Sequence, residues 1–316
     1  MQRIIIDTDP GIDDAAAILM ALASPELSVE AVTTIFGNGP VDMCTVNARR
    51  VLSFAGLTDI PVYQGAAKPL LRPSNPNWAL HIHGNDALGE AGVPSPEESP
   101  QPGESRHAAL ELVGRVMGSP GEITIVALGR LTNVALALSL EPRFAQSVAR
   151  VVVMGGAVYV PGNVSPVASA NLYEDPESAA IVYTSGAPLV QVGLDVCNKV
   201  HISQSQLEQI KQADTPTTRL LSAATPSLQR SYVERGLLVE GDGVRFNDLP
   251  AVAFMVDPDL FGCSEMFVEI EIHSSTARGQ TVAQHIGQGP GRPNVTVCLE
   301  VYGERAAALF TERLIG

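Results

Sequence analysis

The sequence predicts an α/β fold in which helices flank a doubly wound, mostly parallel central sheet. Strand-like and helix-like segments alternate from the first residues onward, a pattern typical of parallel sheets joined by crossover helices. Several strand-like segments are short, uninterrupted apolar runs, as expected of strands that helices cover on both faces. The 316 residues contain no convincing internal repeat and no segment that resembles a linker. We therefore expect a single domain over residues 1–316.

The alternation begins with an apolar run over residues 3–7, which predicts a strand, and with an Ala- and Leu-rich helix over residues 13–24. A strand, a helix and a further strand are then expected over residues 29–36, 41–55 and 61–64. After a break the pattern resumes, with helices over residues 107–117, 133–140 and 176–185 and strands over residues 123–128, 151–154 and 189–194.

The remaining segments are less regular. Residues 72–106 are rich in Pro, Gly, Ser, Asn and Glu, and a loop this long inside a compact domain is usually functional or mobile. Helices dominate residues 204–236, and residues 267–273 and 296–302 predict a late pair of strands followed by a helix over residues 305–314.

Composition narrows the function classes. Acidic residues outnumber basic ones by 34 to 20, which gives a formal net charge of -14. This balance disfavours nucleic-acid binding, because gripping a phosphate backbone requires Lys and Arg. It favours a cation or a neutral, hydroxyl-rich ligand, although an acidic surface also simply keeps a cytosolic protein soluble.

The sequence also predicts a cytoplasmic protein without a membrane partner. The opening residues MQRIIIDTDP form no signal peptide, and no apolar stretch approaches the length that spans a bilayer. The four cysteines are widely spaced and form no CxxC pair, which is typical of reduced, mostly buried thiols.

Polar and small residues follow the predicted strands at the points where the strands end. Asp7 and Asp9 leave the first strand, and Asn38 lies just beyond the second. Gly129 follows the strand over residues 123–128, and Asp195 follows the strand over residues 189–194. The carboxyl ends of parallel strands form the ligand crevice of open α/β sheets, so these residues are expected to meet there.

The segment DTDPGIDD over residues 7–14 places four carboxylates within eight residues. Carboxylates this close repel one another, and burying them without a partner is costly. A hard divalent cation with oxygen ligands relieves the repulsion, and Ca²⁺ tolerates the irregular geometry of a loop. Alternatively, Asp13 and Asp14 merely occupy a helix N-terminus, where the helix dipole favours acids. That alternative does not account for all four carboxylates, and we predict a metal site.

This segment resembles the opening signature D-x-D-P-G-x-D-D-A of the inosine-uridine-preferring nucleoside hydrolase family. Other segments match the family in the same order along nearly the whole chain, namely TTIFGN (33–38), LTN (131–133), MGG (154–156), GN (162–163), DPE (175–177), LDV (194–196) and NDLP (247–250). The resemblance implies the nucleoside hydrolase fold. It also implies an enzyme of nucleoside salvage that hydrolyses the N-glycosidic bond of ribonucleosides, releasing ribose and the free purine or pyrimidine base.

The resemblance further implies roles for individual residues. Ca²⁺ would be bound by Asp9, Asp14, the backbone carbonyl of Leu128 and Asp248, together with the ribose diol and the attacking water. Asp9 would also be the general base, because the cation lowers the pKa of the water while Asp9 accepts its proton. The substrate partners would be Asp13 and Asn38 for the 2′-hydroxyl, Asn171 for the 3′-hydroxyl and Asn163 on the 5′ side.

Two positions depart from the family pattern. Ser169 stands where the family's frequent A-E-F-N has the Glu that grips the 5′-hydroxyl, so this partner is weaker and neutral. Asn247 stands where many members have the His that protonates the leaving base, and an amide cannot act as an acid near pH 7. Both remain candidate substrate-binding residues.

The group that activates the leaving base must therefore come from elsewhere. His83 aligns with a family His near the base, and Tyr232 lies on a helix that often lines the pocket. Water could also serve. Without such roles, His83 would be an ordinary loop histidine and Tyr232 an ordinary core residue.

Two other functions compete with hydrolysis of ribonucleosides. A phosphatase of the haloacid dehalogenase type also opens with strand-D-x-D, with Asp7 as nucleophile and Asp9 as acid. It leaves Asp248 unexplained, and no phosphate-binding pattern accompanies it. The alternative is a non-catalytic or weakly catalytic riboside-binding protein of the same fold. By analogy with the family, we expect a homodimer or homotetramer.

Overall fold

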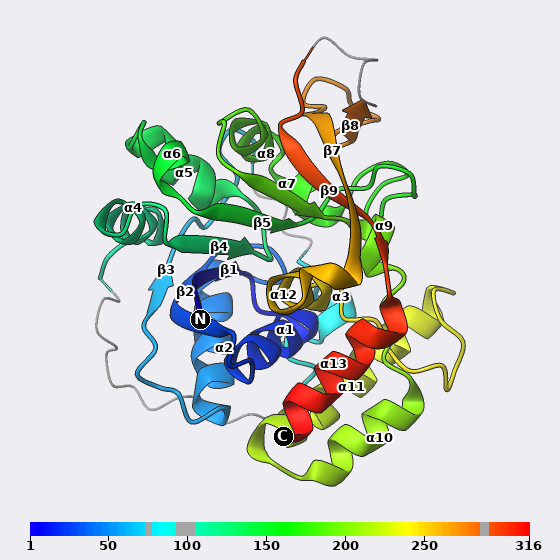
Figure 1. The fold of residues 1–316 in the computed structure, drawn as a ribbon. Helices are drawn as coiled ribbons and strands as arrows, with labels where there is room; N and C mark the ends of the chain where they lie inside the picture. The colour runs from blue at the N-terminus through cyan, green and yellow to red at the C-terminus, as the bar shows by residue number, and fades with distance from the viewer. Residues whose placement is uncertain (74–77, 93–104, 285–290) are drawn as a thin grey trace.

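A computed structural model of the chain describes residues 1–73, 78–92, 105–284 and 291–316. In this part of the chain, one mixed sheet has the strand order β3-β2-β1-β4-β5-β6-β9-β7-β8 (Figure 1). Its strands are β1 (Gln2–Thr8), β2 (Leu27–Thr34), β3 (Val62–Gln64), β4 (Ile123–Ala127), β5 (Arg150–Met154), β6 (Leu189–Val192), β7 (Phe261–Ile270), β8 (Thr281–Gln284) and β9 (Val295–Val301). Pairing is parallel from β3 to β9 along the sheet, and β7 is antiparallel to both β9 and β8.

Helices follow most strands. They are α1 (Ile12–Leu22), α2 (Val41–Phe54), α3 (Leu80–His83), α4 (Ala108–Gly118), α5 (Thr132–Leu140), α6 (Phe144–Ser147), α7 (Ala170–Glu174), α8 (Pro176–Tyr183), α9 (Leu194–Cys197), α10 (Gln204–Ala213), α11 (Pro216–Glu234), α12 (Leu249–Val256) and α13 (Gly303–Ile315), with a short 3₁₀ helix at Pro258–Leu260. None of the described helices combines the length and apolarity needed to cross a membrane.

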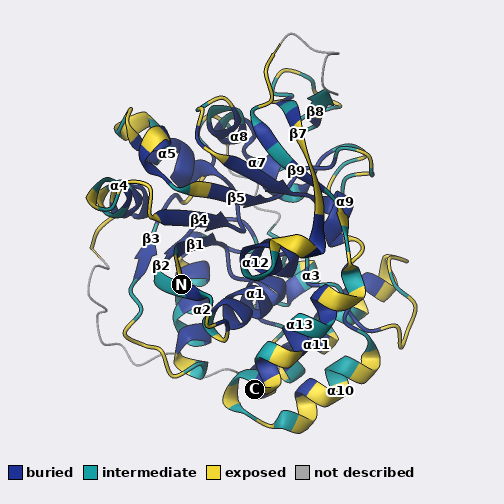
Figure 2. Ribbon diagram, in the orientation of Figure 1, coloured by how far each residue is buried: buried dark blue, intermediate teal, exposed yellow. Residues whose placement is uncertain are grey.

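The sheet separates two hydrophobic cores. Side chains alternate along β1, so Ile4 and Ile6 join the cluster formed with α1, α11, α12 and α13, while Ile5 joins the cluster formed with α4, α5 and α8. Figure 2 shows the central strands buried and α10 largely exposed at the periphery. Because both faces are covered, the strands need no polar alternation, and the predicted doubly wound α/β fold is confirmed.

The late strands differ most from the prediction. β7 begins at Phe261, six residues before the expected start at residue 267, because residues 262–265 are exposed and lack an apolar signal. Pairing with β9 holds this segment in the sheet. α12 was not predicted, since its sequence is apolar on all sides and shows no helical periodicity. Residues 74–77 and 93–104 of the expected long loop lie outside the described residues, and α3 lies within the described part of that loop.

The topology brings the expected polar residues to one edge. Asp7 on β1 is paired with Thr33 on β2 and with Ala127 on β4, so the three strands end at the same level. A cavity of about 670 Å³ lies at this edge, and its lining includes Asp9, Asn38 and Leu128. The predicted ligand crevice is therefore present at the carboxyl ends of the parallel strands.

Candidate active site

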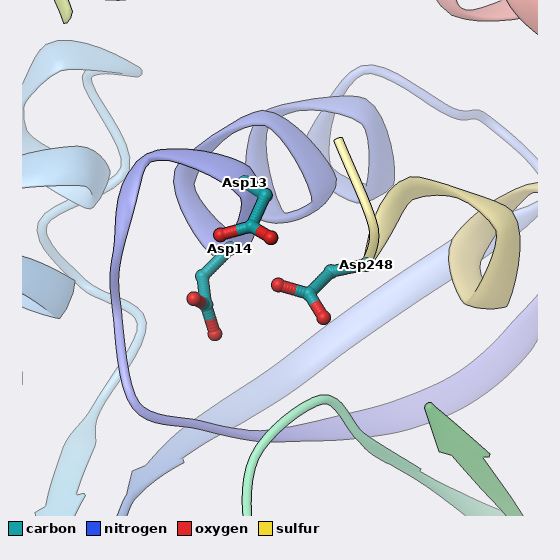
Figure 3. A group of neighbouring side chains, drawn as sticks. All are labelled: Asp13, Asp14 and Asp248. Carbon is teal, nitrogen blue, oxygen red and sulfur yellow. The ribbon is translucent and has the colours of Figure 1, made fainter. Parts of the chain in front are cut away.

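Three carboxylates converge at the start of two helices. Asp13 and Asp14 occupy the first turn of α1, and Asp248 immediately precedes α12. A carboxylate oxygen of each lies within 4.8 Å of those of the other two, and Figure 3 shows the three side chains close together at the starts of α1 and α12. All three residues are buried, with exposed fractions of 6%, 0% and 4%. Helix N-termini favour negative charge, which helps both segments to present acids here.

Asp14 is held firmly. Its Oδ1 accepts a hydrogen bond from Thr8 Oγ1 at 2.5 Å. Its Oδ2 accepts hydrogen bonds from the Gly11 nitrogen and from Asn38 Nδ2, each at 2.9 Å. Gly11 has to be small, since a Cβ there would lie 2.7 Å from Asn38 Nδ2. The turn between β1 and α1 therefore orients this carboxylate before any ligand arrives.

The cluster is electrostatically strained. Burial, followed by repulsion from Asp13, raises the pKa of Asp14 above its ordinary value. Burial and the neighbouring acids likewise raise the pKa of Asp248. Burial raises the pKa of Asp13 to about 6, and its buried Oδ1 has no hydrogen-bond partner among the described residues. An all-oxygen donor set with this much uncompensated charge fits a hard divalent cation.

Asp9 and Leu128 line the same cavity, but both already bond to neighbouring side chains. Asp9 Oδ2 accepts from the Asn38 nitrogen at 2.7 Å and from Arg130 Nη1. The Leu128 carbonyl accepts from Asn171 Nδ2 at 2.5 Å. Of the four predicted metal ligands, Asp14 and Asp248 thus belong to the cluster with Asp13, and the other two lie beside it in the cavity lining.

Arg130 was missed by the sequence analysis. Its guanidinium lies inside the cavity, where the residue is 5% exposed, and it donates to both Asp9 and Asn171. Its position in the sequence could have identified it, because Arg130 directly follows Leu128 and Gly129 at the end of a predicted strand. A basic residue at that edge of a parallel sheet is a candidate contact for a ligand, just as an acidic residue is.

The two candidate leaving-group residues are both in the cavity wall. His83 Nδ1 accepts a hydrogen bond from the Ile12 nitrogen at 3.2 Å, and its Nε2 lies 3.8 Å from Asp13 Oδ1. Burial lowers the pKa of His83 to about 4, so the ring is neutral at pH 7. Tyr232 Oη accepts from Asn247 Nδ2 at 3.1 Å. Burial raises the pKa of Tyr232 well above its ordinary value, so the phenol stays protonated.

The residues expected on the 5′ side also border the cavity. Ser169 is 1% exposed, and its hydroxyl accepts a hydrogen bond from the Gly156 nitrogen at 2.7 Å. Asn163 Oδ1 accepts from the Ala170 nitrogen at 2.9 Å. Ser169 therefore stabilises the loop after β5, and its hydroxyl can still donate one hydrogen bond.

Two prominent acids of the sequence serve the fold instead. Asp7 is fully buried, and its Oδ1 accepts from Thr33 Oγ1 at 2.6 Å and from Asn133 Nδ2 at 2.8 Å. The carboxylate of Asp195 accepts from two successive backbone nitrogens, those of Val158 and Tyr159. Neither Asp7 nor Asp195 belongs to the acidic cluster or to the described cavity lining.

Comparison with known proteins agrees with this geometry. The model of the family described as inosine-uridine preferring nucleoside hydrolase matches residues 4–308. The chain is 36% identical to a probable uridine nucleosidase 2 of Arabidopsis thaliana, over 99% of this chain and 98% of the relative. It is also 36% identical to the pyrimidine-specific ribonucleoside hydrolase RihA of Citrobacter koseri, over 98% of this chain and 97% of that protein.

Solved structures give the same result. A plant nucleoside hydrolase, the PpNRh1 enzyme, superimposes with a TM-score of 0.93 at 38% identity, over 100% of this chain and 99% of the other. A purine-preferring ribonucleoside hydrolase from Gardnerella vaginalis gives a TM-score of 0.92 at 27% identity, over 100% and 98% of the two chains. These comparisons support neither the phosphatase nor the non-catalytic binding protein. The chain belongs to the inosine-uridine preferring nucleoside hydrolase family and is an enzyme that hydrolyses ribonucleosides.

Proposed function

We propose that this hydrolase is Ca²⁺-dependent and that water displaces the base directly, with Asp9 as the general base. The observation that carries the proposal is the convergence of Asp13, Asp14 and Asp248 beside the cavity. Asp14 and Asp248 would hold the cation together with Asp9 and the Leu128 carbonyl. When bound, Ca²⁺ supplies Lewis acidity that lowers the pKa of a water molecule, and it holds a vicinal diol.

Side chains of the protein then transfer the proton and stabilise the developing charge. Asp9 accepts a proton from the attacking water as the water oxygen forms a bond to C1′ of the ribose. The electron pair of the C1′–N bond leaves with the base, so positive charge develops on the sugar. The carboxylate of Asp13 stabilises this charge, because it lies in a buried and preorganised site.

Hydroxyl recognition uses groups that the fold has already positioned. Asp13 Oδ1, which is buried without a partner among the described residues, can accept a hydrogen bond from the 2′-hydroxyl. Asn38 also lines the cavity and donates to the adjacent Asp14, and we assign it to the same hydroxyl. Asn171, which lies between Leu128 and Arg130, is assigned to the 3′-hydroxyl. Asn163 and Ser169 are assigned to the 5′ side.

Tyr232 is the best-placed donor to the leaving base. The amide of Asn247 donates to the Tyr232 oxygen, so the phenol hydrogen remains available for a base in the cavity. A low pKa excludes His83 as a source of protons at neutral pH, although a neutral imidazole can still donate a hydrogen bond. We infer that Tyr232 hydrogen-bonds the leaving base and that His83 assists from the Asp13 side.

The remaining inferences concern the cellular setting. We propose a cytoplasmic enzyme of purine or pyrimidine nucleoside salvage that works as a homodimer or homotetramer. The net charge of -14 supports small nucleosides as partners over nucleic acids. Light scattering of the purified enzyme measures the oligomeric state directly.

A substrate panel tests the reaction. Purine and pyrimidine ribonucleosides, their 2′-deoxy analogues and para-nitrophenyl phosphate are assayed for released sugar or phosphate, with and without a chelator. We expect free ribose from ribonucleosides only, and loss of this activity on chelation. Full activity in the metal-stripped enzyme, or equal rates on 2′-deoxynucleosides, would contradict the proposed use of a metal-held diol.

A further inference from the structure

Arg130 lines the active-site cavity. Arg130 follows β4 and Gly129, and its Nη1 donates to Asp9 Oδ2 and, at 3.3 Å, to Asn171 Oδ1. It therefore contacts both the proposed general base and the proposed partner of the 3′-hydroxyl. The side chains of Arg130 and Asp9 are 6% and 2% exposed, so solvent hardly screens this ion pair.

The local backbone is shaped for this pair. Gly37, which follows β2, faces it directly, and a Cβ at this position would lie 2.1 Å from Asp9 Oδ2 and 2.2 Å from Arg130 Nη1. No larger residue fits there unless the pair separates. The nitrogen of Asn38, the next residue, donates to the same Asp9 oxygen. The ends of β2 and β4 thus hold Asp9 and Arg130 together as one unit.

The position of this cation is unexpected for the reaction. Positive charge develops on the ribose during cleavage of the glycosidic bond, and a divalent cation is expected at the neighbouring carboxylates. A fixed guanidinium at Asp9 opposes both by electrostatic repulsion. In a buried site, where the effective dielectric constant is low, this repulsion is considerably stronger than in water.

We propose that Arg130 is a counter-cation of the metal site, which neutralises Asp9 in the metal-free enzyme and thereby weakens the binding of the divalent ion. The inference rests on the proposed metal site at Asp9, Asp14, Leu128 and Asp248. When the ion binds, it shares Asp9 with the guanidinium, and two cations on one carboxylate repel each other. Removing the guanidinium removes this repulsion, so the affinity for the ion should increase.

Calorimetric titration of CaCl₂ into the full-length, metal-stripped enzyme tests this. Arg130→Gln should bind calcium at least about 10-fold more tightly than the wild type, since even one +1/+2 repulsion within about 10 Å exceeds that factor at an effective dielectric constant near 20. Arg130→Lys keeps the charge and should stay within about 3-fold of the wild type by the same argument.

Arg235→Gln is the matched control. Arg235 also lines the cavity and its loss changes the net charge equally, but it is exposed at the end of α11. Solvent screens it, so its variant should bind calcium within about 2-fold of the wild type. Unchanged or weaker calcium affinity in Arg130→Gln overturns the inference, as does equal tightening in Arg235→Gln.

If Arg130→Gln does not fold without metal, a second measurement tests the inference. Arg130→Gln is purified in calcium and challenged with excess fluorescent chelator, and calcium release should be at least about 10-fold slower than from the wild type. Equal or faster release overturns the inference. A wild-type enzyme that binds no calcium, manganese or magnesium instead contradicts the proposed metal site itself, which is a separate result.

Discussion

The side-chain amide of Asn247 donates a hydrogen bond to the hydroxyl oxygen of Tyr232 at 3.1 Å, and both residues line the active-site cavity. The two residues come from different elements, since Tyr232 is on α11 and Asn247 lies just before α12. Because the amide nitrogen can only donate, the Tyr232 oxygen is the acceptor in this contact. The phenol hydrogen is then directed elsewhere, and the cavity is the space beside it.

Tyr232→Phe removes this hydrogen and keeps the ring that packs in the core. We expect kcat for ribonucleosides to fall about 10- to 100-fold with little change in KM, because the lost hydrogen bond acts mainly on the charge of the departing base. A para-nitrophenyl riboside, whose leaving group needs no donor, is the control. An equal loss of kcat on both substrates would show that Tyr232 serves structure instead of leaving-group activation.

Asp9→Asn tests the general base. An amide of the same shape cannot accept the proton, so kcat should fall by at least about 100-fold. Asp7→Asn is the matched control, because Asp7 lies two residues away, is fully buried and points to Thr33 and Asn133. The new amide oxygen can still accept those hydrogen bonds, and turnover should stay within about 3-fold of the wild type. Steady-state kinetics on both purified variants decides the matter, and near-wild-type rates in Asp9→Asn would exclude the assigned role.

The parallel part of the sheet and its crevice were predictable from local pattern. The run over residues 3–7 is apolar throughout because helices cover both faces of β1, and this pattern identifies a parallel sheet. Once the sheet is parallel, the carboxyl ends of its strands must share an edge. This geometry predicts that Asp9, Asn38 and Leu128 lie together, and the three residues line one cavity.

Side-chain pairing within the site was not predictable in this way. The contact between Asp9 and Arg130 joins residues 121 positions apart, and its hydrogen bonds depend on the space left by Gly37. The contact between Asn247 and Tyr232 depends on how α11 packs beside the loop before α12. Hydrophobic periodicity contains no information on either. For the same reason, the sequence did not show that Ser169 bonds the Gly156 nitrogen.

Asp248→Asn separates the charge repulsion within the acidic cluster from the proposed binding of calcium by that cluster. Burial, with repulsion from Asp14 and Asp13, raises the pKa of Asp248, so neutralising this residue relieves strain in the metal-free enzyme. The metal-free variant should therefore unfold at a higher temperature than the metal-free wild type. In excess calcium the order should reverse, because one proposed ligand is missing and binding stabilises the folded state less. Differential scanning fluorimetry under both conditions checks this, and an unchanged order would argue against calcium at the cluster.

The stability of the metal-stripped enzyme should fall as the pH rises. Burial raises the pKa of Asp7 to about 7 and that of Asp13 to about 6, from an ordinary value of 3.8. Between the ordinary value of 3.8 and these raised values, the folded state therefore binds more protons than the unfolded state. The stabilisation is complete below the unfolded pKa, and it is lost as the pH passes through 6 to 7.

Calcium should oppose this trend, because its proposed ligands Asp9, Asp14 and Asp248, whose pKa values burial also raises, bind the ion only as carboxylates. Thermal unfolding of the metal-stripped enzyme at intervals between about pH 5 and pH 8, with and without added CaCl₂, measures both effects. We expect Tm to decrease with pH in the absence of metal, and the increment due to calcium to grow over the same range. A metal-free Tm that rises towards pH 8 would mean that these buried carboxylates are already compensated by groups of the protein. An increment independent of pH would place calcium away from Asp9, Asp14 and Asp248.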